Sequence, residues 1–251
     1  MAGVSGTRSR SFLRLTPEAS ALVLLGAGGW VVILWFAQGM GAMAGTLWLG
    51  VAGFLAVWSL MMVAMMLPSV APVAALYARS FTERRPRRLL VFASGYLLVW
   101  IASGLPALGA AWVFGRLVGT NPLAIRATAC IVCLGVAAYQ VTPVKRRCLT
   151  HCRSPLSLLL HYAAYRGRFR ELGVGVHHGA YCLGCCWPLM ILLVALGTMN
   201  LAAMVLVAGF VLLEKYPPRG WPVSWIGAAV AAGFAVLVLA LPQITPALPV
   251  M

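Results

Sequence analysis

The sequence predicts an all-α protein, a polytopic bundle of transmembrane helices. Apolar residues make up 62% of the 251 residues and charged residues only 9%, whereas soluble domains average about 25% charged residues. The apolar residues are also gathered into runs of about 20, the length that crosses a hydrocarbon core of roughly 30 Å. We therefore expect the lipid bilayer to surround most of the chain.

Seven apolar runs are candidate spans. In chain order they cover 21–38, 47–67, 89–114, 123–144, 172–196, the short 199–213, and 223–241. Only Gly197-Thr198 and Asn200 separate the fifth run from the sixth, so six spans is the alternative count. The first run follows a basic leader and precedes Ala42-Met43-Ala44, which has the form of a signal-peptide cleavage site. Because the run is long for a signal peptide, we expect a retained helix.

The basic residues indicate the orientation of these spans. With the N-terminus in the cytoplasm, all of the 19 Lys and Arg residues except Arg116 and Arg126 lie on the cytoplasmic side. Such an excess is typical of the cytoplasmic loops of membrane proteins, and it places the C-terminus outside. It also accounts for the net charge of +15, so we expect no nucleic-acid partner.

The chain is expected to form a single transmembrane domain at 21–241. A basic cytoplasmic arm at 1–20 precedes this domain, and a short outer tail at 242–251 follows it. The largest polar segment is the cytoplasmic loop at 145–171. No internal repeat and no soluble domain is evident.

Composition narrows the chemistry that the chain could perform. All four acidic residues are Glu, so Asp-containing triads, paired-carboxylate hydrolysis and oxygen-ligand cages for Mg²⁺ or Ca²⁺ lack their residues. Without an ATP-binding motif, pumping driven by ATP hydrolysis is not expected. Seven Cys, four His and eleven Met remain, and these are soft or borderline metal ligands.

The fifth apolar run carries the densest group of such ligands. At about 100° per residue, His178, Cys182 and Cys185 share one helix face, with Cys186 at its edge. An imidazole and two or three thiols on one face suit Cu(I) or Zn²⁺. Cysteine also packs as a small apolar residue, but three Cys in five residues beside a His favour a metal site.

A second group of ligands follows the fourth apolar run. Cys148, His151 and Cys152 would lie on one helix face just past the membrane. The neighbouring Arg and Lys residues are expected to lower the pKa of both thiols and to favour the thiolate. The alternative is an ordinary basic loop at the membrane surface, in which the Cys residues are incidental.

Cys130 and Cys133 lie inside the fourth run, and their role is less clear. Cys130 is 18 residues, or about 27 Å along a helix, from Cys148, which excludes a shared four-Cys zinc site unless Pro143 folds the chain back. Cys133 and Cys182 are each ten residues from the start of their own run. The two could therefore meet near the membrane midplane, and simple packing is the alternative.

The second apolar run ends in a group of methionines. Met61 and Met65 are separated by one helical turn, and thioethers bind Cu(I) and few other biological cations. They could relay an ion, although methionine is also a common filler of apolar cores.

The chain resembles the bacterial multi-pass proteins that are described as predicted metal-binding integral membrane proteins, some of which are labelled copper chaperones. The most specific part of the resemblance is Cys182-Leu183-Gly184-Cys185-Cys186-Trp187. The other parts are Met61-Met62-x2-Met65-Met66-x-Pro68-Ser69, Gly95-Tyr96-x3-Trp100, Tyr139-Gln140-x-Thr142-Pro143-x-Lys145, Cys148-Leu149-x-His151-Cys152-Arg153-x-Pro155, His178-Gly179, Met199-Asn200 and Glu214-Lys215. The resemblance implies a multi-pass protein of the bacterial inner membrane with a metal site.

The function that these observations favour is binding or transfer of a transition metal, with copper(I) as the first choice and zinc as the alternative. The ion would pass between the cytoplasmic group around Cys148 and the midplane group around Cys182. A metallochaperone or a membrane metalloenzyme would be the partner. Two other functions stay open: a membrane thiol-disulfide oxidoreductase, and an assembly or anchoring subunit of a membrane metalloenzyme.

Overall fold

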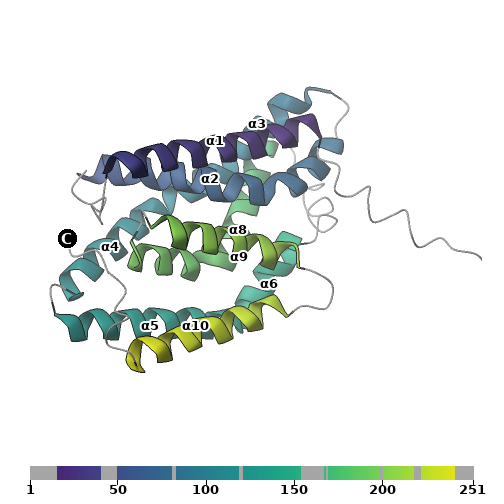
Figure 1. The fold of residues 1–251 in the computed structure, drawn as a ribbon. Coiled ribbons are helices and arrows are strands. Elements are labelled where there is room, and N and C mark those ends of the chain that lie inside the picture. The colour runs from purple at the N-terminus through teal and green to yellow at the C-terminus, as the bar shows by residue number, and fades with distance from the viewer. Residues whose placement is uncertain are drawn as a thin grey trace, which may run out of the picture.

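The computed structural model describes residues 16–40, 50–80, 83–118, 121–153, 167, 169–197, 200–217 and 222–240, and these contain helices and turns but no strand (Figure 1). The predicted all-α class is confirmed. Most of the predicted basic arm, the whole of the predicted outer tail and the middle of the 145–171 loop lie outside these residues.

Every predicted span coincides with a helix or a pair of helices. The helices are α1 (Pro17–Met40), α2 (Gly50–Arg79), α3 (Arg85–Ala102), α4 (Gly104–Val118), α5 (Pro122–Gln140), α6 (Pro143–Arg153), α8 (Arg170–Ala195), α9 (Leu201–Lys215) and α10 (Val223–Ala240). Within the described residues, six apolar segments are long enough to cross a membrane, with α3 and α4 counted as one. Helix α9 has 15 residues, about 22 Å, and is short for a span.

The helices form three layers, and α8 lies in the middle one. Figure 1 shows α1 and α2 along one side, α5 and α10 along the other, and α8 and α9 between them. Of the apolar window in α8, 61% is buried inside the protein, more than in any of the other five candidate spans. The helix that carries most of the candidate ligands is therefore the core helix of the bundle.

Glycines allow α8 to pack directly on α3. A Cβ atom on Gly175 would overlap the carbonyl oxygen of Phe92, and one on Gly95 would overlap that of Leu172. Gly175 and Gly179 lie one turn apart on the same face, the small-xxx-small pattern that lets membrane helices approach closely. Near their first turns, Arg88 of α3 and Glu171 of α8 form an ion pair at 3.7 Å, so the two helices run in the same direction.

Contacts between α5, α8 and α10 give the directions of the later helices. Tyr139 at the end of α5 donates a hydrogen bond to the Gly184 carbonyl in the middle of α8, whereas Ala129 in the first half of α5 packs with Ala195 at the end of α8. Arg126 donates to the carbonyl of Leu239, at the end of α10. Helix α5 is thus antiparallel to both α8 and α10. Helices α8 and α10 therefore run in the same direction, and α9, which connects them, runs in the opposite direction. Seven passes fit these directions, but the span count and the orientation stay predictions.

The chain bends sharply between α5 and α6. The Thr142 hydroxyl accepts a hydrogen bond from the Lys145 amide (3.2 Å) and so caps α6, and Pro143 occupies the first turn, where its missing N–H costs nothing. Helix α6 packs against α8 and α9. The segment expected to continue outward from the fourth span instead lies along the central helix.

Candidate metal centre

Three thiols of α8 gather at the centre of the bundle. The sulfur atoms of Cys182, Cys185 and Cys186 all lie within 4.8 Å of one another. Their exposed fractions are 0%, 1% and 0%. The close spacing follows from the helix, because positions i, i+3 and i+4 share one face.

Helix α6 adds a fourth thiol to this group. Side-chain hydrogen bonds link Cys152 to Cys182 and Cys185, and Cys152 is 2% exposed. Cys148 lies one turn earlier, beside Gly184, where a Cβ atom would come within 3.0 Å of its sulfur. The sequence analysis treated a cytoplasmic group and a midplane group as separate sites, and this was wrong. The bend at Pro143 brings the two groups together.

A buried lysine touches the central thiol. Lys215 Nζ donates to Cys182 Sγ at 3.1 Å and to Ser69 Oγ at 2.8 Å, and the residue is only 3% exposed. The Tyr96 hydroxyl lies 3.1 Å from the same sulfur. A positive charge is therefore fixed beside the sulfur that would carry negative charge in a metal site.

A second buried charge pair holds α6 in place. Lys145 donates to Glu214 Oε2 at 2.7 Å, with exposed side-chain fractions of 1% and 2%. Arg153, at the other end of α6, donates to the backbone carbonyl of Glu214 at 2.6 Å. Both ends of α6 are thus attached to the end of α9, which fixes the position of Cys148 and Cys152 against α8.

Sequence reasoning missed the roles of Lys145, Glu214 and Lys215. The available signal was charge at the boundary of apolar runs, because ionisable residues that enter the interior of such bundles are costly and usually have a partner. Glu214, at the end of α9, is a buried carboxylate of this kind.

His178 lies beside the thiols but outside the group of three sulfurs. It is 1% exposed, and its ring is 6.0 Å from that of Tyr96 and 6.2 Å from that of Phe92, measured between centroids. Its Nδ1 atom is buried and has no hydrogen-bond partner within the described residues. An unpartnered buried nitrogen one turn from Cys182 fits a metal ligand.

His151 does not accompany Cys152 into the thiol group. Its ring stacks on Tyr181 with centroids 3.9 Å apart, and the ring of His177 lies 5.7 Å away. The predicted trio Cys148, His151 and Cys152 therefore divides between two places along the interface of α6 and α8.

One further predicted ligand, Cys133, lies apart from the thiols. Cys133 packs with Cys130 and Ala235 of α10 in a separate buried cluster, so the expected meeting with Cys182 is not what the structure shows. Helix α10 supplies Ala235 and Phe234 to this cluster, and α8 supplies Leu192, which lies ten residues beyond Cys182. Packing was the alternative, and the contacts favour it.

The methionines of α2 are buried in the main core. Met61 is 0% exposed and Met65 is 2% exposed. Among the described contacts, one links a methionine sulfur of α2 to the site. The Met66 sulfur lies 3.9 Å from Ser69 Oγ, and Ser69 Oγ accepts a hydrogen bond from Lys215. The predicted methionine group therefore reaches the site through Met66, one residue beyond Met65.

The predicted lowering of the thiol pKa values in α6 was wrong. Burial, followed by the nearby Cys185, raises the pKa of Cys148. Hydrogen bonds with Cys182 and Cys185, together with burial, raise the pKa of Cys152 well above its ordinary value. The basic residues do not oppose this because Arg146 and Arg147 are exposed and Lys145 is paired with Glu214.

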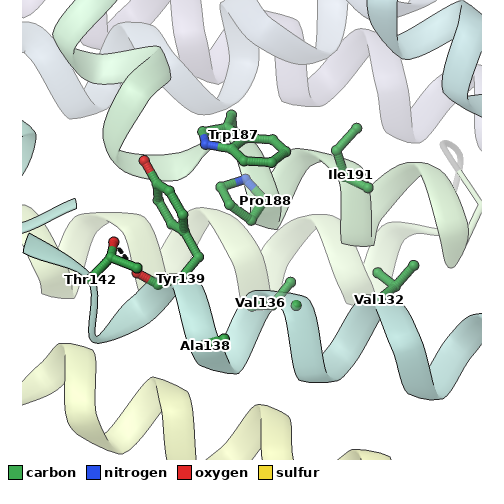
Figure 2. A pocket seen from close by; sticks show the side chains of 9 residues that line it. Val132, Val136, Ala138, Tyr139, Thr142, Trp187, Pro188 and Ile191 are labelled. Atoms are coloured by element: carbon green, nitrogen blue, oxygen red, sulfur yellow. Dashed lines mark hydrogen bonds between the residues drawn. The ribbon is translucent and has the colours of Figure 1, made fainter. Parts of the chain in front are cut away.

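An apolar cavity of about 400 Å³ lies next to the site. Figure 2 shows Tyr139 of α5 facing Trp187 and Pro188 of α8 across it. The rings of Tyr139 and Trp187 meet edge to face at 5.4 Å. Because no thiol or imidazole lines this cavity, it is not the metal centre.

The fold and the buried thiols define a helical bundle whose described residues include six segments long and apolar enough to cross a membrane. The bundle holds a candidate site for a soft metal. A family model agrees: that of PpoB2, described as a copper chaperone, matches residues 55–240. The chain belongs to the PpoB2 copper chaperone family. No curated protein and no solved structure matches it.

Proposed function

We propose that the protein binds Cu(I) at the buried thiols of α8 and α6 and transfers it to or from a partner at the bacterial inner membrane. Cys152 and two of the three α8 thiols, Cys182, Cys185 and Cys186, hold the ion. Cys148, half-buried on the same interface, exchanges it with the partner, which is a metallochaperone or a membrane metalloenzyme.

The spacing of the three α8 sulfurs carries the proposal. With metal–sulfur bonds of about 2.3 Å, sulfurs around one ion are roughly 4.0 Å apart in a trigonal site and roughly 4.6 Å apart in a linear one. The three sulfurs already lie within 4.8 Å of one another. Small side-chain rotations suffice to bind one ion, and the Cys152 thiol lies in contact with two of the same sulfurs.

The chemistry of the ligands favours copper over harder ions. Thiolates and thioethers select Cu(I), whereas Mg²⁺, Ca²⁺ and Mn²⁺ prefer oxygen. Glu214, which precedes Lys215 in the sequence, has a carboxylate that could bind a harder ion, but this carboxylate is paired with Lys145. Met61, Met65 and Met66 of α2 supply thioethers for a relay. Zinc is the alternative ion, and it would take all four thiols of Cys182, Cys185, Cys186 and Cys152.

Charge at the two ends of the bundle supports the membrane orientation. Arg88 and Glu171 mark one end, at the start of α3 and α8, and α6 with its basic residues packs toward this end. Arg126 lies near the other end. We place the basic end in the cytoplasm by the positive-inside rule.

The test is copper binding by the full chain, purified in detergent under reducing and anaerobic conditions and titrated against a coloured Cu(I) chelator. The wild type should take Cu(I) from the chelator. Replacing Cys182 and Cys185 together with Ser should abolish binding at the thiols, while Cys130→Ser should leave it unchanged, because Cys130 is equally buried but lies in another cluster. Equal loss in both variants, or none in either, contradicts the proposal.

A further inference from the structure

Two imidazoles from different helices meet on the outer side of the thiol group. His151 of α6 and His177 of α8 have ring centroids 5.7 Å apart. Both are half-buried, and both contact Tyr181, at 3.9 Å and 4.9 Å between centroids. Helical periodicity turns His177 away from the face that carries His178, Cys182 and Cys185, so no role was expected for it.

The separation of the two rings fits a shared metal ion. A metal–nitrogen bond is about 2.0–2.1 Å long and adds to roughly 1.1 Å from nitrogen to ring centre, so the ion lies about 3.2 Å from each centroid. Two rings around one ion are then roughly 5.2 Å apart at a tetrahedral angle and roughly 6.4 Å apart at a linear one. The observed 5.7 Å lies between these limits.

The pair is also correctly placed to supply the thiols. His151 immediately precedes Cys152, and Tyr181 immediately precedes Cys182, so the imidazoles and thiols follow one another along the same interface. The thiols of Cys152, Cys182, Cys185 and Cys186 are at most 2% exposed, whereas both imidazoles, like Cys148, are half-buried. An ion that approaches from the surface therefore meets the imidazoles before it meets the buried sulfurs.

We propose that His151 and His177 form a second metal site, a capture site at which Cu(I) binds before it moves to the thiols. The identity and destination of the ion rest on the proposed function. Imidazole is a weaker ligand for Cu(I) than thiolate, so transfer runs energetically downhill. The ion stays Cu(I), bonds to nitrogen break as bonds to sulfur form, and each proton lost by a thiol passes to a vacated imidazole nitrogen. Tyr181 holds the His151 ring in position by stacking.

The test uses the full chain in detergent, anaerobically loaded with one and then two equivalents of Cu(I) and measured by X-ray absorption. In the wild type the first ion should show sulfur ligands and the second nitrogen ligands. His177→Phe and His151→Phe keep an aromatic ring at the interface. Each should lose the second ion, retain the first, and load the thiols at least tenfold more slowly. Cys130→Ser, which changes a buried residue of another cluster, should bind both ions.

Unchanged copper content and unchanged nitrogen ligands in both His variants would overturn the capture site. So would a wild type that binds only sulfur-ligated copper, although the proposed function would then stand. Conversely, a nitrogen-ligated ion that disappears in His177→Phe, in a protein that shows no sulfur-ligated copper, would support the second site and refute the proposed function. Helical circular dichroism equal to that of the wild type verifies that each variant is folded.

Discussion

Lys215 Nζ lies 3.1 Å from Cys182 Sγ, at the centre of a bundle that leaves the lysine only 3% exposed. A buried ammonium is unfavourable unless a negative group balances it. A Cu(I) ion bound by two thiolates and one neutral thiol carries a net charge of −1, and Lys215 would bring the site to neutrality. The lysine is therefore expected to favour binding of a monovalent ion by thiolates.

Replacing Lys215 with Met should weaken Cu(I) binding. Two unit charges about 4 Å apart interact by roughly 4 kcal/mol at an effective dielectric constant of about 20, which is an upper limit here. We expect the dissociation constant for Cu(I) to rise about 10- to 100-fold, as measured by competition with a coloured chelator. Arg126→Met removes a positive charge near the other end of the bundle, so it should change the constant little. Equal constants in Lys215→Met and wild type would rule out a role of this charge in binding.

The Lys145–Glu214 pair should contribute to stability as a unit. Removing one partner leaves a buried charge alone and typically costs about 3–5 kcal/mol, whereas replacing both by apolar residues is often nearly neutral. Glu214→Gln should therefore lower the midpoint of thermal unfolding in detergent far more than the double change of Lys145 and Glu214 to Met. If the double variant is the less stable of the two, the pair does not act as described.

Gly175 should not tolerate a side chain. A Cβ atom there would overlap the backbone of Phe92 in α3, so Gly175→Ala should separate α3 from α8 and destabilise the protein by about 1–3 kcal/mol, the usual cost of overpacking. Gly209 of α9 has open space around a Cβ atom, and Gly209→Ala should be neutral or stabilising. Thermal unfolding of both variants checks the contrast, and similar midpoints would contradict the close contact of α3 and α8.

The raised pKa of Cys148 should appear in its reactivity. A raised pKa favours the protonated thiol, so less thiolate is present at pH 7 than in an ordinary cysteine, and thiolate is the reactive form. The rate of alkylation by iodoacetamide, followed by mass spectrometry of the metal-free protein, should reach half its maximum above the pH that an unperturbed cysteine requires, about 8.5. A midpoint below that pH would mean that the basic residues of α6 dominate after all.

Alkylation also separates metal binding from disulfide chemistry at Cys152. Bound Cu(I) protects the thiol until a chelator removes the ion, whereas a disulfide protects it until a reductant opens the bond. We expect anaerobic chelation alone to release Cys152 for alkylation. Release by the reductant alone would favour the oxidoreductase that the sequence left open.

The fold class and the positions of the helices followed from the sequence because apolar runs of membrane length have few other structures available. The shared face of Cys182 and Cys185 followed from helical periodicity alone. The position of α6 did not, since periodicity within one helix does not say which helices are neighbours. Thr142-Pro143 is a recognisable helix start, and the buried pair of Lys145 and Glu214 attaches the new helix to the bundle.

The central claim is that thiols from α8 and α6 bind one Cu(I) ion together. The most direct measurement is the number of sulfur ligands around one equivalent of Cu(I), determined by X-ray absorption in the wild type, in Cys152→Ser and in Cys130→Ser. The account predicts a site of about three sulfurs that loses one in Cys152→Ser and keeps all of them in Cys130→Ser. An unchanged sulfur number in Cys152→Ser, or copper without sulfur ligands in the wild type, would contradict it.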